Sequence, residues 1–218
     1  MLNAKQTQAA ISVMGEIFPN AQTSLVADNS FHFLLAVILS AQTTDKAVNQ
    51  LTPALFARYP QPLDLARADE AEVRSLIKTI GLYRNKAKYL VACAQGLVAK
   101  FDGQVPQTRS ELMQLAGVGQ KTADVVLAEC FQIPAIAVDT HVSRVAKRLA
   151  IVPKNASVLQ IEHTLMQKLP QSSWISAHHR MIFWGRYQCL ARRPNCSNCP
   201  LLEICSAGKG LIKKGLAK

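Results

Sequence analysis

The chain has 218 residues, 49% of them hydrophobic, so it is long enough to bury a sizeable core as one domain or as two small ones. Its 25 lysines and arginines outnumber its 14 acidic residues, and the resulting net charge of +11 favours polyanionic partners through counterion release. No secretion signal opens the chain and no apolar run is long enough to cross a bilayer, so we expect a cytoplasmic protein without a membrane partner.

Apolar residues recur with helical spacing along almost the whole chain, and no sustained alternation predicts a strand. The fold class is therefore predicted to be all-α. In chain order, helices are expected over residues 5–18, 30–42, 45–59, 69–80, 84–101, 108–115, 120–131, 140–149, 157–168 and 174–189. The lysine-containing segment from Ser206 onward is predicted to be a mobile basic arm.

A glycine-rich turn, Leu-Ala-Gly-Val-Gly-Gln-Lys-Thr-Ala over residues 115–123, separates two of the predicted helices. Gly117 and Gly119 permit a tight turn whose backbone N–H groups, near a helix N-terminus, can bind a phosphate. Lys121 follows in the first turn of the second helix, where it can be an amine nucleophile. Taken alone, the pattern is also typical of an ordinary helical hairpin with a solvated lysine.

The segment Val-Asp-Thr-His at residues 138–141 opens the next predicted helix. Asp139 stands at the N-cap position, where an aspartate commonly accepts hydrogen bonds from helix amides. A carboxylate held in this way can also stabilise positive charge that develops on a sugar. Capping and catalysis are compatible, so both interpretations stay open.

Four cysteines with the spacing C-x6-C-x2-C-x5-C form the clearest ligand pattern: Cys189, Cys196, Cys199 and Cys205. In a reducing compartment such a group indicates metal ligation rather than disulfides. Structural zinc sites mostly use two short C-x2–4-C pairs, so the spacing favours an iron–sulfur cluster, with zinc as the alternative. Cys93 and Cys130 lie on apolar helical patterns and are expected to be small core residues.

With these motifs, the chain closely resembles the endonuclease III family of DNA glycosylases with abasic-site lyase activity, from about residue 4 to residue 207. Residues 115–123 match the family's helix-hairpin-helix, with Lys121 as a catalytic residue, and residues 137–141 match its catalytic aspartate motif, with Asp139. The four cysteines match its 4Fe-4S ligands. The resemblance implies a two-lobed fold: a six-helix domain over 23–133, a discontinuous cluster domain of 1–22 and 134–211, and a basic tail over 212–218.

The resemblance also marks the loops at 40–45 and 80–83 as segments that invade the duplex and fill the gap left by an extruded base. Gln42 and Leu82 are the side chains implied; taken alone, they would be interpreted as a helix-capping residue and a core residue. The other implied DNA contacts are Gly117, Val118, Gly119, Gln120, Thr122, His141, Arg192 and Arg193. The last two belong to a basic loop between the first two cysteines.

Three residues depart from the family pattern around the turn. Ala116 replaces the usual proline and Gln120 a frequent basic residue, which puts the affinity for phosphate slightly in doubt. Asp124, where asparagine is usual, adds a negative charge one helical step from Lys121.

The function implied is that of a bifunctional glycosylase and abasic-site lyase of base excision repair, which removes oxidised pyrimidines. It would act as a monomer, in the cytoplasm or nucleoid, on double-stranded DNA containing damaged pyrimidines or abasic sites. One rival is a monofunctional glycosylase for mispaired bases, whose members generally lack the hairpin lysine. The other is a non-catalytic helix-hairpin-helix protein, which would bind DNA without forming a covalent lysine adduct.

Overall fold

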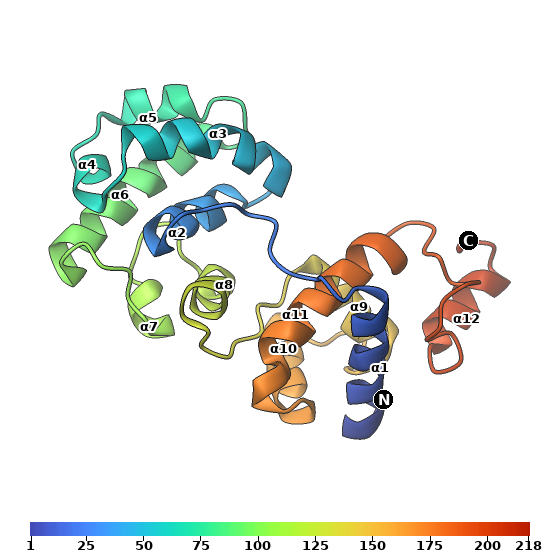
Figure 1. The fold of residues 1–218 in the computed structure, drawn as a ribbon. Coiled ribbons are helices and arrows are strands. Elements are labelled where there is room, and N and C mark those ends of the chain that lie inside the picture. Colours follow the sequence, from blue (N-terminus) through green and yellow to red (C-terminus); the bar gives the residue numbers. More distant parts are fainter. The chain divides into compact units, whose positions relative to one another are not determined.

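The structure is a computed structural model that describes residues 1–218. It is helical throughout and contains no strand, which confirms the predicted fold class. The chain forms two compact units (Figure 1). The continuous unit is Ser24–Ile133, and the discontinuous unit combines Met1–Thr23 with Pro134–Lys218. No helix is both long enough and apolar enough to span a membrane.

The continuous unit is built around one almost entirely buried helix. Its helices are α2 (Ser30–Leu39), α3 (Asp45–Arg58), α4 (Pro62–Ala66), α5 (Glu70–Leu76), α6 (Tyr83–Phe101), α7 (Arg109–Leu112) and α8 (Gln120–Phe131). Every residue of α2 after Ser30 is buried, and α2 contacts α3, α6 and α8. Apart from Ser30 and His32 its residues are apolar, and such a helix is stable only inside a core, so α2 forms the centre of this unit.

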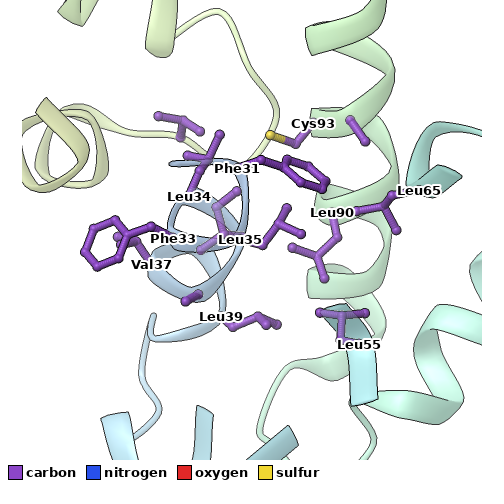
Figure 2. Close-up of a cluster of buried hydrophobic side chains, with 14 of the residues drawn as sticks. Phe31, Phe33, Leu34, Leu35, Val37, Leu39, Leu55, Leu65, Leu90 and Cys93 are labelled. Atoms are coloured by element: carbon purple, nitrogen blue, oxygen red, sulfur yellow. The ribbon is translucent and has the colours of Figure 1, made fainter. Parts of the chain in front are cut away.

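Figure 2 shows what surrounds α2: Leu55 of α3, Leu65 of α4, and Leu90 and Cys93 of α6. These four side chains are completely buried. Burial of one such leucine stabilises the fold by roughly 1.5–3 kcal/mol. The expected core position of Cys93 is confirmed, and Cys130 packs against the same core while remaining partly exposed.

The discontinuous unit has its own apolar core. Its elements are α1 (Ala4–Ile17), α9 (Thr140–Arg148), α10 (Val158–Lys168), the 3-10 turn η1 (Gln171–Ser173), α11 (Trp174–Phe183), the π-helical turn η2 (Trp184–Gln188) and α12 (Ser206–Lys213). Helix α1 contacts α10 and α11 and contributes Met14 to the core, where Met181 and Trp184 also lie. Residues from both ends of the chain therefore complete this unit.

Several predictions of secondary structure need correction. The segment from Ser206 is not a free arm, because Ser206–Lys213 forms α12, and residue 218 exchanges backbone hydrogen bonds with Pro194 and Ser197. Helix α4 is a five-residue element in a region where no helix was expected. The helix predicted over 174–189 changes to a π-helical turn at Trp184. The helices predicted over 30–42, 69–80 and 108–115 end earlier, at Leu39, Leu76 and Leu112.

Candidate functional site

The glycine turn joins α7 to α8 in the continuous unit. Gly117 has a φ of 78°, a conformation that side chains disfavour, and a β-carbon there would lie 2.9 Å from the β-carbon of Tyr89. Val118 is buried and anchors the turn, and its N–H donates to the carbonyl of Leu115 at 3.2 Å. Gly119 is the N-cap of α8, and no side chain caps this helix. An uncapped helix N-terminus is suited to bind an anion through its backbone N–H groups.

Lys121 lies in the first turn of α8, and its side chain is exposed. Gln120 and Thr122 on either side are half-buried. The unusual Asp124 is only 1% exposed, and its carboxylate accepts a 2.7 Å hydrogen bond from Nε of Arg109 in α7. Arg109 therefore compensates the negative charge that Asp124 introduces into this helix.

Asp139 is the N-cap of α9 in the discontinuous unit, as predicted. Its Oδ1 accepts hydrogen bonds from the backbone N–H groups of His141 and Val142, both at 2.8 Å. The residue is half-buried, and Oδ2 has no hydrogen-bond partner within the protein. One carboxylate oxygen thus fixes the side chain, while the other can interact with a ligand.

Two arginines of α9, one helical turn apart, connect this helix to the first cysteine of the cluster pattern. Arg144 donates to the carbonyl oxygens of Gly185 at 2.6 Å and Cys189 at 2.9 Å, and it also contacts Nδ1 of His141 at 3.1 Å. Arg148 donates to the carbonyl oxygens of Leu190 at 2.6 Å and Ala191 at 3.0 Å. Asp139 and His141 therefore share a helix with the groups that hold the cysteine segment.

The four cysteines line one cavity, together with Arg148, Trp184, Gly208 and Leu211 among others. Arg148 lies 3.4 Å from Sγ of Cys189, and the N–H of Gly208 donates to Sγ of Cys205 at 3.3 Å. No group of three or more His, Cys, Asp or Glu side chains is arranged to hold a single metal ion.

The chemistry of this cavity fits an iron–sulfur cluster. Burial raises the pKa of the Cys196, Cys199 and Cys205 thiols, and the neighbouring Cys189 sulfur adds to the rise in each case. Four thiolates are costly in such a place unless a cationic centre compensates them. Cysteine thiolates are the usual ligands of such clusters, and the arginine and N–H donors near the sulfurs are the contacts that tune them.

The basic loop between the first two cysteines is exposed at Arg192 and Arg193, and Arg193 adopts a left-handed conformation with a φ of 47°. The loop is fixed at its far end, because Pro194 is buried and its carbonyl accepts a hydrogen bond from the N–H of Lys218 at 2.9 Å. Its near end is fixed by Arg148. The two guanidinium groups are therefore presented on an immobilised backbone.

Gln42 and Leu82 are both exposed, at two turns of the continuous unit. Both have left-handed backbones, with φ of 54° and 59°, which is uncommon for residues other than glycine, asparagine and aspartate. Leu82 is 54% exposed, so it is not the core residue that its apolar side chain alone would indicate. Such strained exposed residues are concentrated at binding and catalytic sites.

The expected residues fall into two groups. The continuous unit carries Gln42, Leu82, the glycine turn and Lys121, and the discontinuous unit carries Asp139, His141, the cysteines and the basic loop. Sequence reasoning missed the groups that hold them in place: Lys86, Arg109, Arg144 and Arg148. The spacing of Arg144 and Arg148 on one helix face was a visible signal, but their carbonyl partners more than 40 residues away were not.

Comparison with known proteins shows which family the chain resembles. Residues 35–171 match the HhH-GPD superfamily, described as a base excision DNA repair protein. The chain is 48% identical to Endonuclease III of Bacillus subtilis (strain 168) over 218 residues, with all of both chains covered. It is 42% identical to Endonuclease III of Synechocystis sp. over 211 residues, which cover 96% of each chain.

Among solved structures, a trapped Endonuclease III–DNA covalent intermediate superposes with a TM-score of 0.94 at 47% identity, covering 97% of this chain and all of the other. A thermostable thymine-DNA glycosylase shares the fold at 22% identity, with a TM-score of 0.86 over 94% and 98% of the two chains. The named relatives are 42–48% identical over almost the whole chain, and the superfamily match covers most of it. These similarities establish the family of the chain. The chain belongs to the endonuclease III family and is a DNA glycosylase and abasic-site lyase of base excision repair.

Proposed function

We propose that this enzyme acts as a monomer in the cytoplasm or nucleoid on double-stranded DNA that contains oxidised pyrimidines or abasic sites. The net charge of +11 supports a nucleic-acid partner, because cationic side chains release counterions from the phosphate backbone. The relatives at 47% identity are described as a trapped covalent intermediate and a non-covalent complex with DNA, which supports the same partner here.

Lys121 is the nucleophile in this proposal. Its amine attacks C1′ of the damaged nucleotide, the bond from C1′ to the base breaks, and the base leaves with a proton. The sugar ring then opens: the bond from C1′ to the ring oxygen breaks, that oxygen takes up a proton, and C1′ forms an imine with the lysine nitrogen. The imine acidifies the proton on C2′, and removal of this proton expels the 3′ phosphate and cuts the strand by β-elimination. Water then hydrolyses the imine and regenerates the lysine. The observation that carries this role is the exposed Lys121 in the first turn of an uncapped helix, directly after the glycine turn.

Asp139 stabilises the positive charge that develops on the sugar as the base leaves, and assists proton transfer. Its support is structural: Oδ1 is held by two backbone N–H groups, while Oδ2 has no partner within the protein. A carboxylate that is already oriented needs little reorganisation in the transition state, which is what electrostatic stabilisation requires.

The remaining residues bind and deform the duplex. Gln42 and Leu82 are the wedge residues, which fill the space left by the extruded nucleotide and so lower the cost of unstacking. The N-terminus of α8, with Gly117, Val118, Gly119, Gln120 and Thr122, receives a backbone phosphate. Arg192, Arg193 and His141 supply further contacts on the discontinuous unit.

Cys189, Cys196, Cys199 and Cys205 would hold a 4Fe-4S cluster. The cluster supplies a rigid cross-link rather than a reacting group, because cleavage of the sugar–base bond transfers no net electrons. The cluster would influence DNA binding by holding the basic loop in place, because Cys189 and Cys196 flank Arg192 and Arg193. Iron and acid-labile sulfide analysis of the purified protein distinguishes this cluster from zinc.

Borohydride trapping on a duplex with one oxidised pyrimidine tests the reaction. Borohydride reduces the imine to a stable amine, so wild-type protein should form a covalent adduct and cut the strand. Lys121→Gln should bind the duplex but form no adduct. Lys100→Gln is the matched control, because Lys100 is exposed in the last turn of α6, and it should behave as wild type.

Each alternative gives a different result. Base release without an adduct would identify a monofunctional glycosylase. Binding with neither base release nor an adduct would favour the non-catalytic interpretation. Normal strand cutting by a folded Lys121→Gln variant would refute the assignment of the nucleophile.

A further inference from the structure

A buried lysine lies beside the loop that carries Gln42. Lys86 of α6 is only 3% exposed, although lysine is among the residues least often buried. Its Nζ donates hydrogen bonds to the carbonyl oxygen of Leu39 at 2.9 Å and to the hydroxyl of Thr43 at 2.7 Å. No carboxylate lies within ion-pair distance of this amine.

This arrangement is energetically expensive. Burial lowers the pKa of Lys86, because the charged ammonium loses hydration that neutral oxygens only partly replace. An apolar side chain of similar length would fill the same space without this cost. Core packing therefore does not explain why a lysine occupies this position. The explanation lies in the two groups, on Leu39 and Thr43, that its hydrogen bonds hold.

The two bonds lie on either side of Gln42. Leu39 is the last residue of α2, and the chain then turns through Ser40 to Thr44, with Gln42 in the left-handed conformation. The hydroxyl of Thr43 also donates to the carbonyl of Ala41 at 3.4 Å. Lys86 thus fixes the chain before and after the strained residue, directly in one case and through Thr43 in the other.

The same lysine is close to Leu82 along α6. Leu82 is the N-cap of this helix, and its carbonyl accepts the first helical hydrogen bond from the N–H of Lys86 at 3.0 Å. The backbone of Lys86 therefore belongs to the turn that presents Leu82, and its side chain holds the turn that presents Gln42. A single residue links the two loops.

We propose that Lys86 is a positioning residue that fixes the Gln42 loop relative to Leu82, so that both wedge residues enter the duplex together. The inference rests on the proposed function of Gln42 and Leu82. Lys86 itself is buried, so it acts on DNA only through the loops that it connects.

The test compares two reactions of the same protein. Release of a paired oxidised pyrimidine requires extrusion of a stacked base, whereas cleavage at a preformed abasic site does not. In single-turnover assays, Lys86→Met should slow base release by about tenfold or more while changing abasic-site cleavage much less. The substitution removes two hydrogen bonds, and loss of even one hydrogen bond from a charged group is worth about a factor of ten. Thr43→Val, which removes only the hydroxyl, should shift the ratio in the same direction.

A second readout follows the DNA directly. With 2-aminopurine opposite the lesion, wild-type protein should raise the fluorescence as the base pair opens, and both variants should reduce this rise. Lys88→Met is the matched control, because Lys88 is exposed on the same helix, and it should change neither readout. If Lys86→Met does not fold, Thr43→Val decides the outcome alone.

Gln42→Ala separates the two ways in which the idea can fail. If Gln42→Ala loses base release selectively while the Lys86 and Thr43 variants keep the wild-type ratio, Lys86 is not a positioning residue and the proposed function stands. If Gln42→Ala also has the wild-type ratio and fluorescence, the wedge role itself is wrong. Equal losses in both reactions for Lys86→Met and Thr43→Val would assign Lys86 to general stability only.

Discussion

At the scale of single residues, the backbone fixes Asp139, Gln42 and Leu82 in different ways. Asp139 caps its helix by accepting hydrogen bonds from backbone N–H groups two and three residues further along the chain. Gln42 and Leu82 adopt left-handed backbones, a conformation that neither residue type favours. Each costs on the order of 1–3 kcal/mol, which the surrounding contacts must offset.

At this scale, the structure predicts different losses of stability when the two glycines of the turn are replaced by alanine. Gly117→Ala should destabilise the protein by about 1–3 kcal/mol, because it combines a positive φ with a contact at 2.9 Å to the β-carbon of Tyr89. Gly119→Ala should cost less than about 1 kcal/mol, since its backbone is extended and its new methyl group would meet no atom within 4 Å. Urea unfolding of the two variants beside wild type measures both values. Equal destabilisation would contradict this account of the turn.

At the scale of elements, helices with strong apolar periodicity were predicted, whereas α4 and α12 were missed. Helix α4 has five residues, which is too short to produce a periodic pattern. Helix α12 contains Gly208 and Gly210 and has poor intrinsic propensity. It forms because Sγ of Cys205 accepts a hydrogen bond from the N–H of Gly208, and because Leu211 lines the cysteine cavity. Those contacts exist only in the folded chain.

Helix α12 therefore provides a test of the cysteine cavity. A β-carbon at Gly208 would lie 3.4 Å from Sγ of Cys205 and 3.6 Å from Sγ of Cys196, whereas one at Gly210 would meet nothing within 4 Å. The proposed 4Fe-4S cluster would give the purified protein iron and visible absorption, and we expect Gly208→Val to lower both, because its γ-methyl groups would crowd the cavity. Gly210→Val should retain both, although it has the same effect on helix propensity. Cluster content that is the same in the two variants would exclude this role for Gly208.

At the scale of the whole molecule, the chain forms two cores, one from a continuous segment and one from its two terminal segments. The continuous unit uses one uninterrupted segment of the chain, Ser24–Ile133. The discontinuous unit needs α1, which is more than 100 residues from its nearest partner helix in that unit. Besides its apolar contacts, the N-terminal segment is held by a hydrogen bond from Nζ of Lys168 to the carbonyl of Leu2 at 2.6 Å. Apolar periodicity alone predicts α1 but not its partners, and only the resemblance indicated this connection.

Because the two units have separate cores, we expect truncation of a buried side chain in one unit to destabilise mainly the helices of that unit. Met14 and Leu34 are both completely buried, one in each unit. Truncation of such a side chain to alanine costs about 2–5 kcal/mol. In amide hydrogen exchange on the full chain, Met14→Ala should accelerate exchange in α10 and α11 and leave α3 and α6 near their wild-type rates, and Leu34→Ala should do the reverse. If each variant accelerated exchange equally in all four helices, the two cores would unfold as one cooperative structure, and the separate packing of the units would not govern their stability.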